Sequence, residues 1–108
     1  VFNQDISGWN VSNVTDMGSM FKYADAFNQP IGSWDVSSVT DMSGMFNNAD
    51  SFDNDISDWN FSSITSMVNF MDTHQYDTTY YTNLLTSLKS ISLLLFLTWQ
   101  LKLMWIDQ

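Results

Sequence analysis

Apolar residues recur along this chain at a fixed interval of 25 positions. The phrases "FNQDISGWNVSNVTDM", "FNQPIGSWDVSSVTDM" and "FDNDISDWNFSSITSM" begin at Phe2, Phe27 and Phe52. Self-similarity at a period of roughly 20 to 50 residues is typical of stacked repeats, in which each unit buries its apolar side against its neighbours. The pattern predicts three 25-residue units that share one interior, at residues 2–26, 27–51 and, in part, 52–71.

The positions that align between the units predict columns of inward side chains. We expect equivalent side chains of successive units to stack on one another, in a structural ladder of Trp9, Trp34, Trp59, Met17, Met42, Met67, Phe21 and Phe46. The tryptophans alone would also suit a stripe that stacks on carbohydrate. Their constant place in the repeat favours the core interpretation.

The apolar spacing changes within each unit. A β-branched run such as "VSNVT" predicts a short strand. The spacing i, i+3, i+4, i+7 of one helix face then follows at Met17, Met20, Phe21 and Ala24. The residues Asp16 and Asp41, or the threonines before them, stand where an N-cap is expected. We therefore predict an α/β repeat in which each coil is a short parallel strand plus a short helix.

The repeat is similar to that of a known family. The units "FNQDISGWNVSNVTDMGSMFKYA" and "FNQPIGSWDVSSVTDMSGMFNNA" resemble the repeat of the BspA-like leucine-rich-repeat surface proteins, whose pattern is W-[DN]-V-S-x-V-T-x-M-x-x-M-F-x-x-A. The resemblance covers residues 2–71, and residues 72–88 resemble a degenerate closing unit. It implies a leucine-rich-repeat-like solenoid, secreted or displayed on a cell surface, that takes part in adhesion or protein binding without catalysis.

Outward positions that differ between units are the candidate contact surface. They include Gly18, Ser19, Ser43 and Gly44, and the contact candidates themselves are Lys22, Tyr23, Asn47 and Asn48. The partner would be an unknown protein or surface ligand. The alternative is a purely structural spacer, with recognition elsewhere in a larger protein.

The charge of the chain argues against nucleic acid as a partner. It has 12 acidic residues, all Asp, against 3 Lys and no Arg, which gives a formal net charge of −9. Affinity for phosphate backbones comes from clustered Lys and Arg. The segment "DSFDNDISD" raises instead the alternative of a calcium-stabilised acidic array, with Asp50, Asp53, Asp55 and Asp58 as metal candidates. Because it lacks the Gly and terminal Glu of an EF-hand loop, we favour a solvated acidic turn.

Catalytic chemistry finds little support in the sequence. His74 is the only His, there is no Cys, and no Glu is present to partner it. No glycines flank a serine as in a nucleophile elbow. We predict no enzyme activity and no cofactor. N-glycosylation sequons begin at Asn10, Asn13 and Asn60, and a turn role explains those at Asn10 and Asn60, since Asp35 holds the same repeat position in the second unit.

The two ends of the chain depart from the repeat. For residues 89–108, "KSISLLLFLTWQLKLMWIDQ", we predict an apolar cap on the third unit, which Leu93, Leu94, Leu97 and Leu101 would face. The alternatives are a membrane-contacting segment and an aberrant C-terminus. The 12 uncharged residues between Lys89 and Lys102 would give a helix of about 18 Å, against roughly 30 Å for a bilayer core.

The chain begins at Val1, within a repeat and without a signal-like leader, so we expect a fragment or a processed product. The first unit leaves an unprotected edge at Val1 and Phe2. Unpaired edges template association with other chains, so the sequence predicts self-association through this end.

Overall fold

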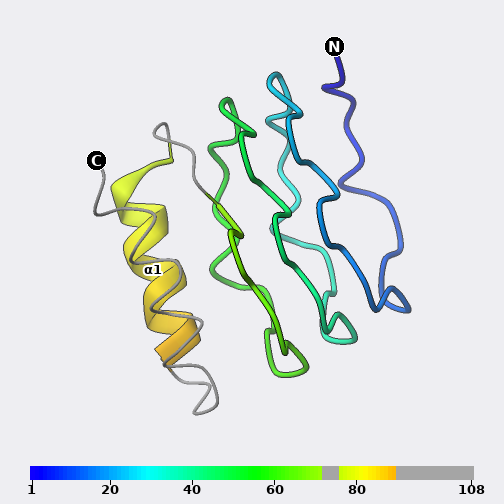
Figure 1. Ribbon diagram of the computed structural model, residues 1–108, viewed down its shortest axis with the longest axis vertical. Helices are drawn as coiled ribbons and strands as arrows, with labels where there is room; N and C mark the ends of the chain where they lie inside the picture. The colour runs from blue at the N-terminus through cyan, green and yellow to red at the C-terminus, as the bar shows by residue number, and fades with distance from the viewer. Residues whose placement is uncertain (72–75, 90–108) are drawn as a thin grey trace.

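The computed structural model describes residues 1–71 and 76–89 (Figure 1). Within these residues the regular secondary structure is one helix, α1, at Thr78–Lys89. The remaining described chain consists of turns and irregular segments. Three isolated parallel β-bridges join Asp16 to Asp41, Asp41 to Ser66 and Phe46 to Met71.

The three repeat units lie side by side as successive turns of the chain, and α1 lies beside the third (Figure 1). Backbone hydrogen bonds join the units in parallel. The amide of Met17 donates to the carbonyl of Asp41 at 2.9 Å, and the amide of Met42 donates to the carbonyl of Ser66 at 2.9 Å. The same offset of 24 positions recurs from Ser19 to Ser43, Phe21 to Met45, Tyr23 to Asn47, Gly44 to Val68 and Phe46 to Phe70.

The predicted α/β leucine-rich-repeat-like solenoid, with a strand and a helix in each coil, is wrong. In the segment predicted as helical, alternate amides donate to the next unit, whereas an α-helix needs each of them to bond four residues back. The amides between them close tight turns, such as Met20 to the carbonyl of Met17 at 3.2 Å. The predicted strand also turns, with the amide of Val14 on the carbonyl of Val11 at 3.0 Å. The described residues form a compact body with one short helix and no sheet.

Residues in the left-handed conformation explain why no helix forms in the repeats. Ser19, Gly44 and Asn69 hold the same place in the three units and have φ values of 59°, 64° and 55°. Tyr23 and Asn48 mark a second such place, with φ values of 62° and 56°. A right-handed helix cannot continue through such a residue. The apolar spacing therefore reflects consecutive tight turns, several of which point an apolar side chain inward.

The residues predicted as helix N-caps instead form Asx turns. The Oδ1 atom of Asp16 accepts the amide of Gly18 at 2.8 Å, and that of Asp41 accepts the amide of Ser43 at 2.8 Å. Small polar side chains favour turns through such bonds to the backbone two residues on. The same bond is made by Asp5, Asn10, Asp35, Asp55 and Asn60.

Aromatic columns form the centre of the shared core. The rings of Phe2, Phe27, Phe52 and Tyr76 stack in sequence, with centroid separations of 5.5, 6.0 and 6.1 Å. Phe21 and Phe46 form a second column at 5.6 Å. Offset stacking at these distances adds to the stabilisation that comes from burying the rings. Large apolar side chains thus hold the units together where a sheet does not.

The helix α1 begins where a polar ladder through the repeats ends. The Oδ1 atoms of Asn3, Asn28 and Asp53 accept the amides of Asn28, Asp53 and Asp77 at 2.9, 2.8 and 2.9 Å. Asp77 then caps α1, because its Oδ1 accepts the amides of Thr79 at 2.7 Å and Tyr80 at 3.1 Å. The start of the helix is thereby tied to the register of the stacked units.

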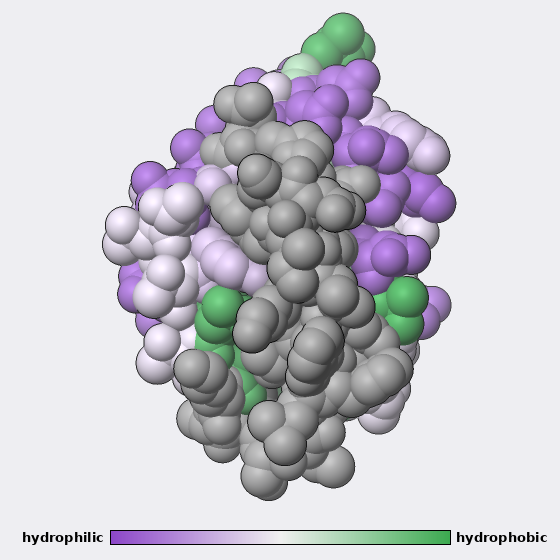
Figure 2. Space-filling view, turned by 60° about the vertical axis from the view of Figure 1, so that its left-hand side comes forward, coloured by the Kyte–Doolittle hydropathy of each residue, from purple (hydrophilic) through white to green (hydrophobic). Residues whose placement is uncertain are grey.

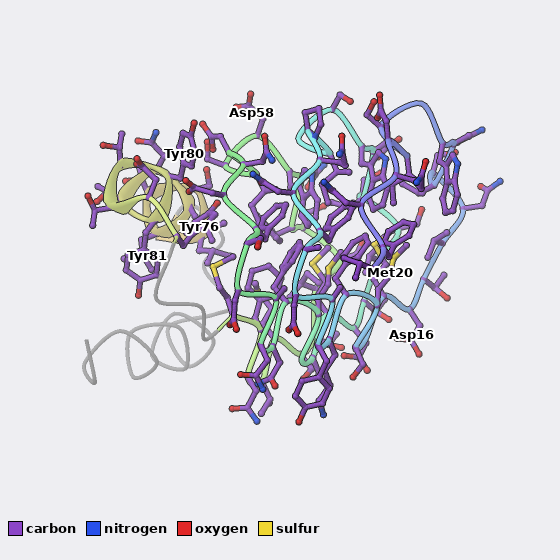
Figure 3. All side chains as sticks on the ribbon, turned by 90° about the horizontal axis from the view of Figure 1, so that it is seen from above. Asp16, Met20, Asp58, Tyr76, Tyr80 and Tyr81 are labelled. Atoms are coloured by element: carbon purple, nitrogen blue, oxygen red, sulfur yellow. The ribbon has the colours of Figure 1, made fainter. Side chains whose placement is uncertain are left out.

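Among the described residues, α1 and Tyr76 cover the third unit. Leu84 and Leu88 are buried, and the hydroxyl of Ser87 donates to the carbonyl of Ser57 at 2.6 Å. Tyr76 and Tyr80 lie at the junction of α1 with this unit (Figure 3). Of the cap predicted for residues 89–108, Lys89 is the last residue of α1, whereas residues 90–108, with the four leucines, lie outside the described residues, as does His74.

Candidate functional site

A surface groove crosses all three repeat units. It has a volume of about 210 Å³ and is lined by Ser19, Lys22, Ser43, Gly44, Asn47, Val68 and Asn69. We call these residues the groove. The first unit contributes two of them, the second three and the third two. The site therefore exists only where the units lie side by side.

The left-handed residues shape the floor of the groove. Gly44 is buried between the equivalent residues Ser19 and Asn69. A Cβ atom at Gly44 would lie 3.3 Å from the Oγ of Ser19, so a side chain here would crowd the hollow. Beside it, the hydroxyls of Ser43 and Ser66 share a hydrogen bond of 2.7 Å. Glycine thus supplies both the backbone conformation and the open space.

Lys22 supplies the positive charge of the groove. Its Nζ lies 5.5 Å from the ring centroid of Tyr23, within the range of a cation–π contact. Tyr23 is 65% exposed and held in place by the bond from its amide to the carbonyl of Asn47. In a chain of net charge −9, this ammonium group is a local attractive point for an anionic group.

The predicted contact residues divide between the groove and its border. Lys22 and Asn47 line the groove, whereas Tyr23 and Asn48 are the residues that follow them in the chain. The Nδ2 of Asn48 donates to the Oδ1 of Asn47 at 3.1 Å, which orients the Asn47 side chain. The four residues therefore belong to one surface that spans the first two units.

Two groove residues lie in the third unit and were not predicted from the variation between the first two units. Val68 aligns at 25 residues with Ser43, and Asn69 aligns with Gly44. Val68 is 44% exposed, which makes it the apolar contact point of the groove. Extending the same 25-residue register to the third unit would have found both.

The acidic metal candidates are not brought together. Among the described residues, no three His, Cys, Asp or Glu side chains gather closely enough to hold a metal ion. Asp53 belongs to the polar ladder and Asp55 accepts the amide of Ser57 at 2.9 Å, while Asp58 points outward (Figure 3). Asp50 is exposed and also makes an interaction of its own. The geometry gives no support to a calcium site at these four residues.

The structural ladder is buried except at its first tryptophan. Trp34 and Trp59 stack at 6.4 Å, and their indole nitrogens donate to the carbonyls of Ile6 at 3.1 Å and Ile31 at 2.9 Å. Trp9 is 57% exposed. The other members, Met17, Met42, Met67, Phe21 and Phe46, are all buried.

The shifted acidities belong to turns and packing. Hydrogen bonds from serine lower the pKa of Asp5, Asp35 and Asp41, in each case from the side chain first and the amide second. Burial raises the pKa of Tyr81 to about 12, and burial followed by the charge of Asp55 raises that of Tyr76. All five groups lie outside the groove lining.

The groove lining combines one ammonium, hydroxyls, amides and an apolar side chain. This set can hold a ligand that offers carboxylate, carbonyl and amide groups, as a peptide does.

Within residues 76–89, no helix is long and apolar enough to cross a membrane.

Comparison with known proteins places the chain in one family. No curated protein and no solved structure matches the sequence. One family matches residues 1–84, which include all three units and the first part of α1. The chain therefore belongs to the family described as Mycoplasma protein of unknown function, DUF285.

Proposed function

We propose that this chain is a non-catalytic binding module that holds a protein ligand in the groove. The observation that carries the proposal is the contrast between inward and outward positions. Inward residues repeat from unit to unit, whereas the groove presents Ser19, Gly44 and Asn69 at one repeat position and Lys22 and Asn47 at another. Packing alone does not require this mixture of polar side chains along one surface.

An extended peptide segment suits the groove best. The amides of Asn47 and Asn69 can each both donate to and accept from a peptide backbone. Lys22 can pair with a ligand carboxylate, and exposed Val68 offers an apolar contact. On the face in Figure 2, the described residues are mainly hydrophilic, with small separate apolar patches. A ligand of this kind would bind through several modest contacts and not through one deep pocket.

The surroundings of the chain are proposed from its resemblance. Residues 2–71 resemble the repeats of BspA-like leucine-rich-repeat surface proteins, which supports a secreted or cell-surface location and a part in adhesion. On this proposal the chain is part of a larger protein whose other segments determine where the groove is displayed.

The proposal is tested by selecting a displayed library of short linear peptides against the wild-type chain. Enriched peptides are then measured against a Lys22→Ala/Asn47→Ala variant and against a Gln4→Ala/Asn13→Ala control. The control residues are exposed, lie outside the groove and make none of the described hydrogen bonds.

We expect at least tenfold weaker binding to the groove variant and unchanged binding to the control. A tenfold loss corresponds to about 1.4 kcal/mol, which removal of a charged and a neutral hydrogen bond readily supplies. Equal binding to both variants, or no enrichment at all, would leave the spacer role as the better account.

A further inference from the structure

The outer face of the first unit carries the same kinds of residue that the second unit buries against the first. We call Phe2, Trp9 and Met20 the first-unit face; they are 44%, 57% and 39% exposed. Their equivalents in the second unit are buried against the first unit: Phe27 at 0%, Trp34 at 4% and Met45 at 0%. The first unit therefore presents a surface whose copy, one unit along, is an interface.

The backbone of this face offers carbonyl acceptors that no described residue uses. In the second unit, the carbonyls of Asp41, Ser43 and Met45 accept amides from the first unit. The equivalent carbonyls, at Asp16, Gly18 and Met20, accept no hydrogen bond from residues 1–71 or 76–89. An incoming unit would have to supply amide donors at every second residue.

The third unit carries such donors at the opposite end of the stack. The amides of Met42 and Gly44 donate to the carbonyls of Ser66 and Val68. Their equivalents, Met67 and Asn69, donate to no acceptor among the described residues. One end of the stack thus has a row of acceptors and the other a row of donors. The two rows are complementary in parallel pairing, because the internal interfaces already join them in that way.

The helix α1 covers the third-unit end of the stack. It buries Leu84 and Leu88 against the third unit, while Tyr76 just before it stacks on Phe52 with centroids 6.1 Å apart. The Ser87 hydroxyl bonds the carbonyl of Ser57 in the same unit. Since α1 occupies the position that another unit would take, docking there requires the helix to move away.

We propose that the first-unit face is a docking surface for the third unit of a second copy of this chain, and that α1 restrains this association by covering that third unit. The contact is heterologous, so each added copy offers the same two ends again and the assembly grows as an open series. The net charge of −9 on each copy opposes association, so salt that screens the charge promotes it.

Cysteine cross-linking on the full chain tests the register of this contact. The chain has no cysteine, and Thr15, Thr40 and Thr65 are exposed. They form a ladder in which Thr40 Oγ1 donates to the Thr15 carbonyl at 3.1 Å and Thr65 Oγ1 donates to that of Thr40 at 3.0 Å. In the docked pair, Thr65 of one copy lies beside Thr15 of the other.

A mixture of Thr15→Cys and Thr65→Cys chains is oxidised and compared with a mixture of Thr15→Cys and Thr40→Cys chains. The first mixture is expected to give at least tenfold more mixed disulfide dimer, since Thr40 has no place beside Thr15 of another copy. Equal yields from the two mixtures would overturn the proposal, because the contact would then lack the predicted register.

Two further variants test the surface and the helix. Phe2→Asp/Trp9→Asp in the Thr15→Cys chain is expected to reduce the specific dimer at least tenfold, while the charge-matched control Ser33→Asp/Ser51→Asp, at exposed positions of the second unit, leaves it unchanged. Leu84→Asp/Leu88→Asp in the Thr65→Cys chain is expected to increase it. If the first-unit substitutions leave the dimer yield unchanged, the docking surface is wrong. That comparison keeps α1 intact, so it decides the matter even where the helix variant fails to fold.

Discussion

Replacing Phe27 with alanine removes the second ring of the column that runs from Phe2 to Tyr76. Phe27 is fully buried and stacks on Phe2 at 5.5 Å, on Phe21 at 4.1 Å and on Phe52 at 6.0 Å. A Phe→Ala change in a core costs roughly 3 to 5 kcal/mol, because a cavity remains in addition to the lost transfer free energy. Three lost ring contacts favour the upper half of that range, so we expect a loss of about 4 kcal/mol in the free energy of unfolding.

Phe2 provides the matched control, since it holds the same repeat position one unit earlier. It is 44% exposed and stacks on Phe27 alone. Full burial of a Phe side chain contributes roughly 1.5 to 3 kcal/mol, so about half of that burial, with no closed cavity left behind, gives a loss of about 1 kcal/mol. The difference between the two variants is therefore expected to be about 3 kcal/mol.

Urea unfolding followed by tryptophan fluorescence measures both losses, because Trp34 and Trp59 are buried in the folded chain. The free energies come from the midpoints and slopes of the two transitions. Equal losses for Phe27→Ala and Phe2→Ala would refute the reasoning, since the first unit would then be covered as completely as the second.

Three further changes test other parts of the structure. Gly44→Ala places a side chain at φ 64°, which is expected to cost about 1 kcal/mol in urea unfolding, whereas Asn69→Gly at the equivalent position should preserve stability. Asp77→Ala removes the N-cap of α1 and should cost roughly 0.5 to 2 kcal/mol, while Asp77→Asn retains most of it; equal losses would argue against the cap. Since burial raises the pKa of Tyr81 from 10.0 to about 12, the folded chain keeps a proton that the unfolded chain releases. Its contribution to stability is complete below pH 10 and is lost as the pH rises towards 12, so Tyr81→Phe should lessen the fall in urea midpoint over that range.

The 25-residue period could be read from the sequence because like residues recur in register, as at Trp34 and Trp59. The backbone conformation within each unit could not be read from the sequence. The spacing of Met17, Met20 and Phe21 fits a helix face, but it fits equally a run of tight turns that each direct a side chain inward. Which of the two forms depends on where the amides donate, and half of them donate to another unit. The left-handed conformation of Ser19 could not be predicted from a single unit, because serine also adopts the other backbone conformations.

The site was partly predictable for the same reason. Lys22 and Asn47 were identified from their variation between units, and both line the groove. The hollow itself depends on Gly44, whose missing side chain separates its neighbours in space. Val68 and Asn69 reach the groove only because the third unit lies beside the second. Such proximity between units follows from the fold and not from any local pattern.

The equivalence of the two internal interfaces has an evolutionary consequence. The amide of Met17 donates to the carbonyl of Asp41 as the amide of Met42 donates to that of Ser66. An in-frame duplication of 25 codons would therefore insert a new unit at either boundary without altering the contacts on each side. The spacing from Phe52 to Tyr76 is 24 residues, and α1 begins directly afterwards. Duplication could therefore add a unit among the first three. It could not do so after the third unit, where the spacing is one residue shorter and α1 takes the place of the next unit.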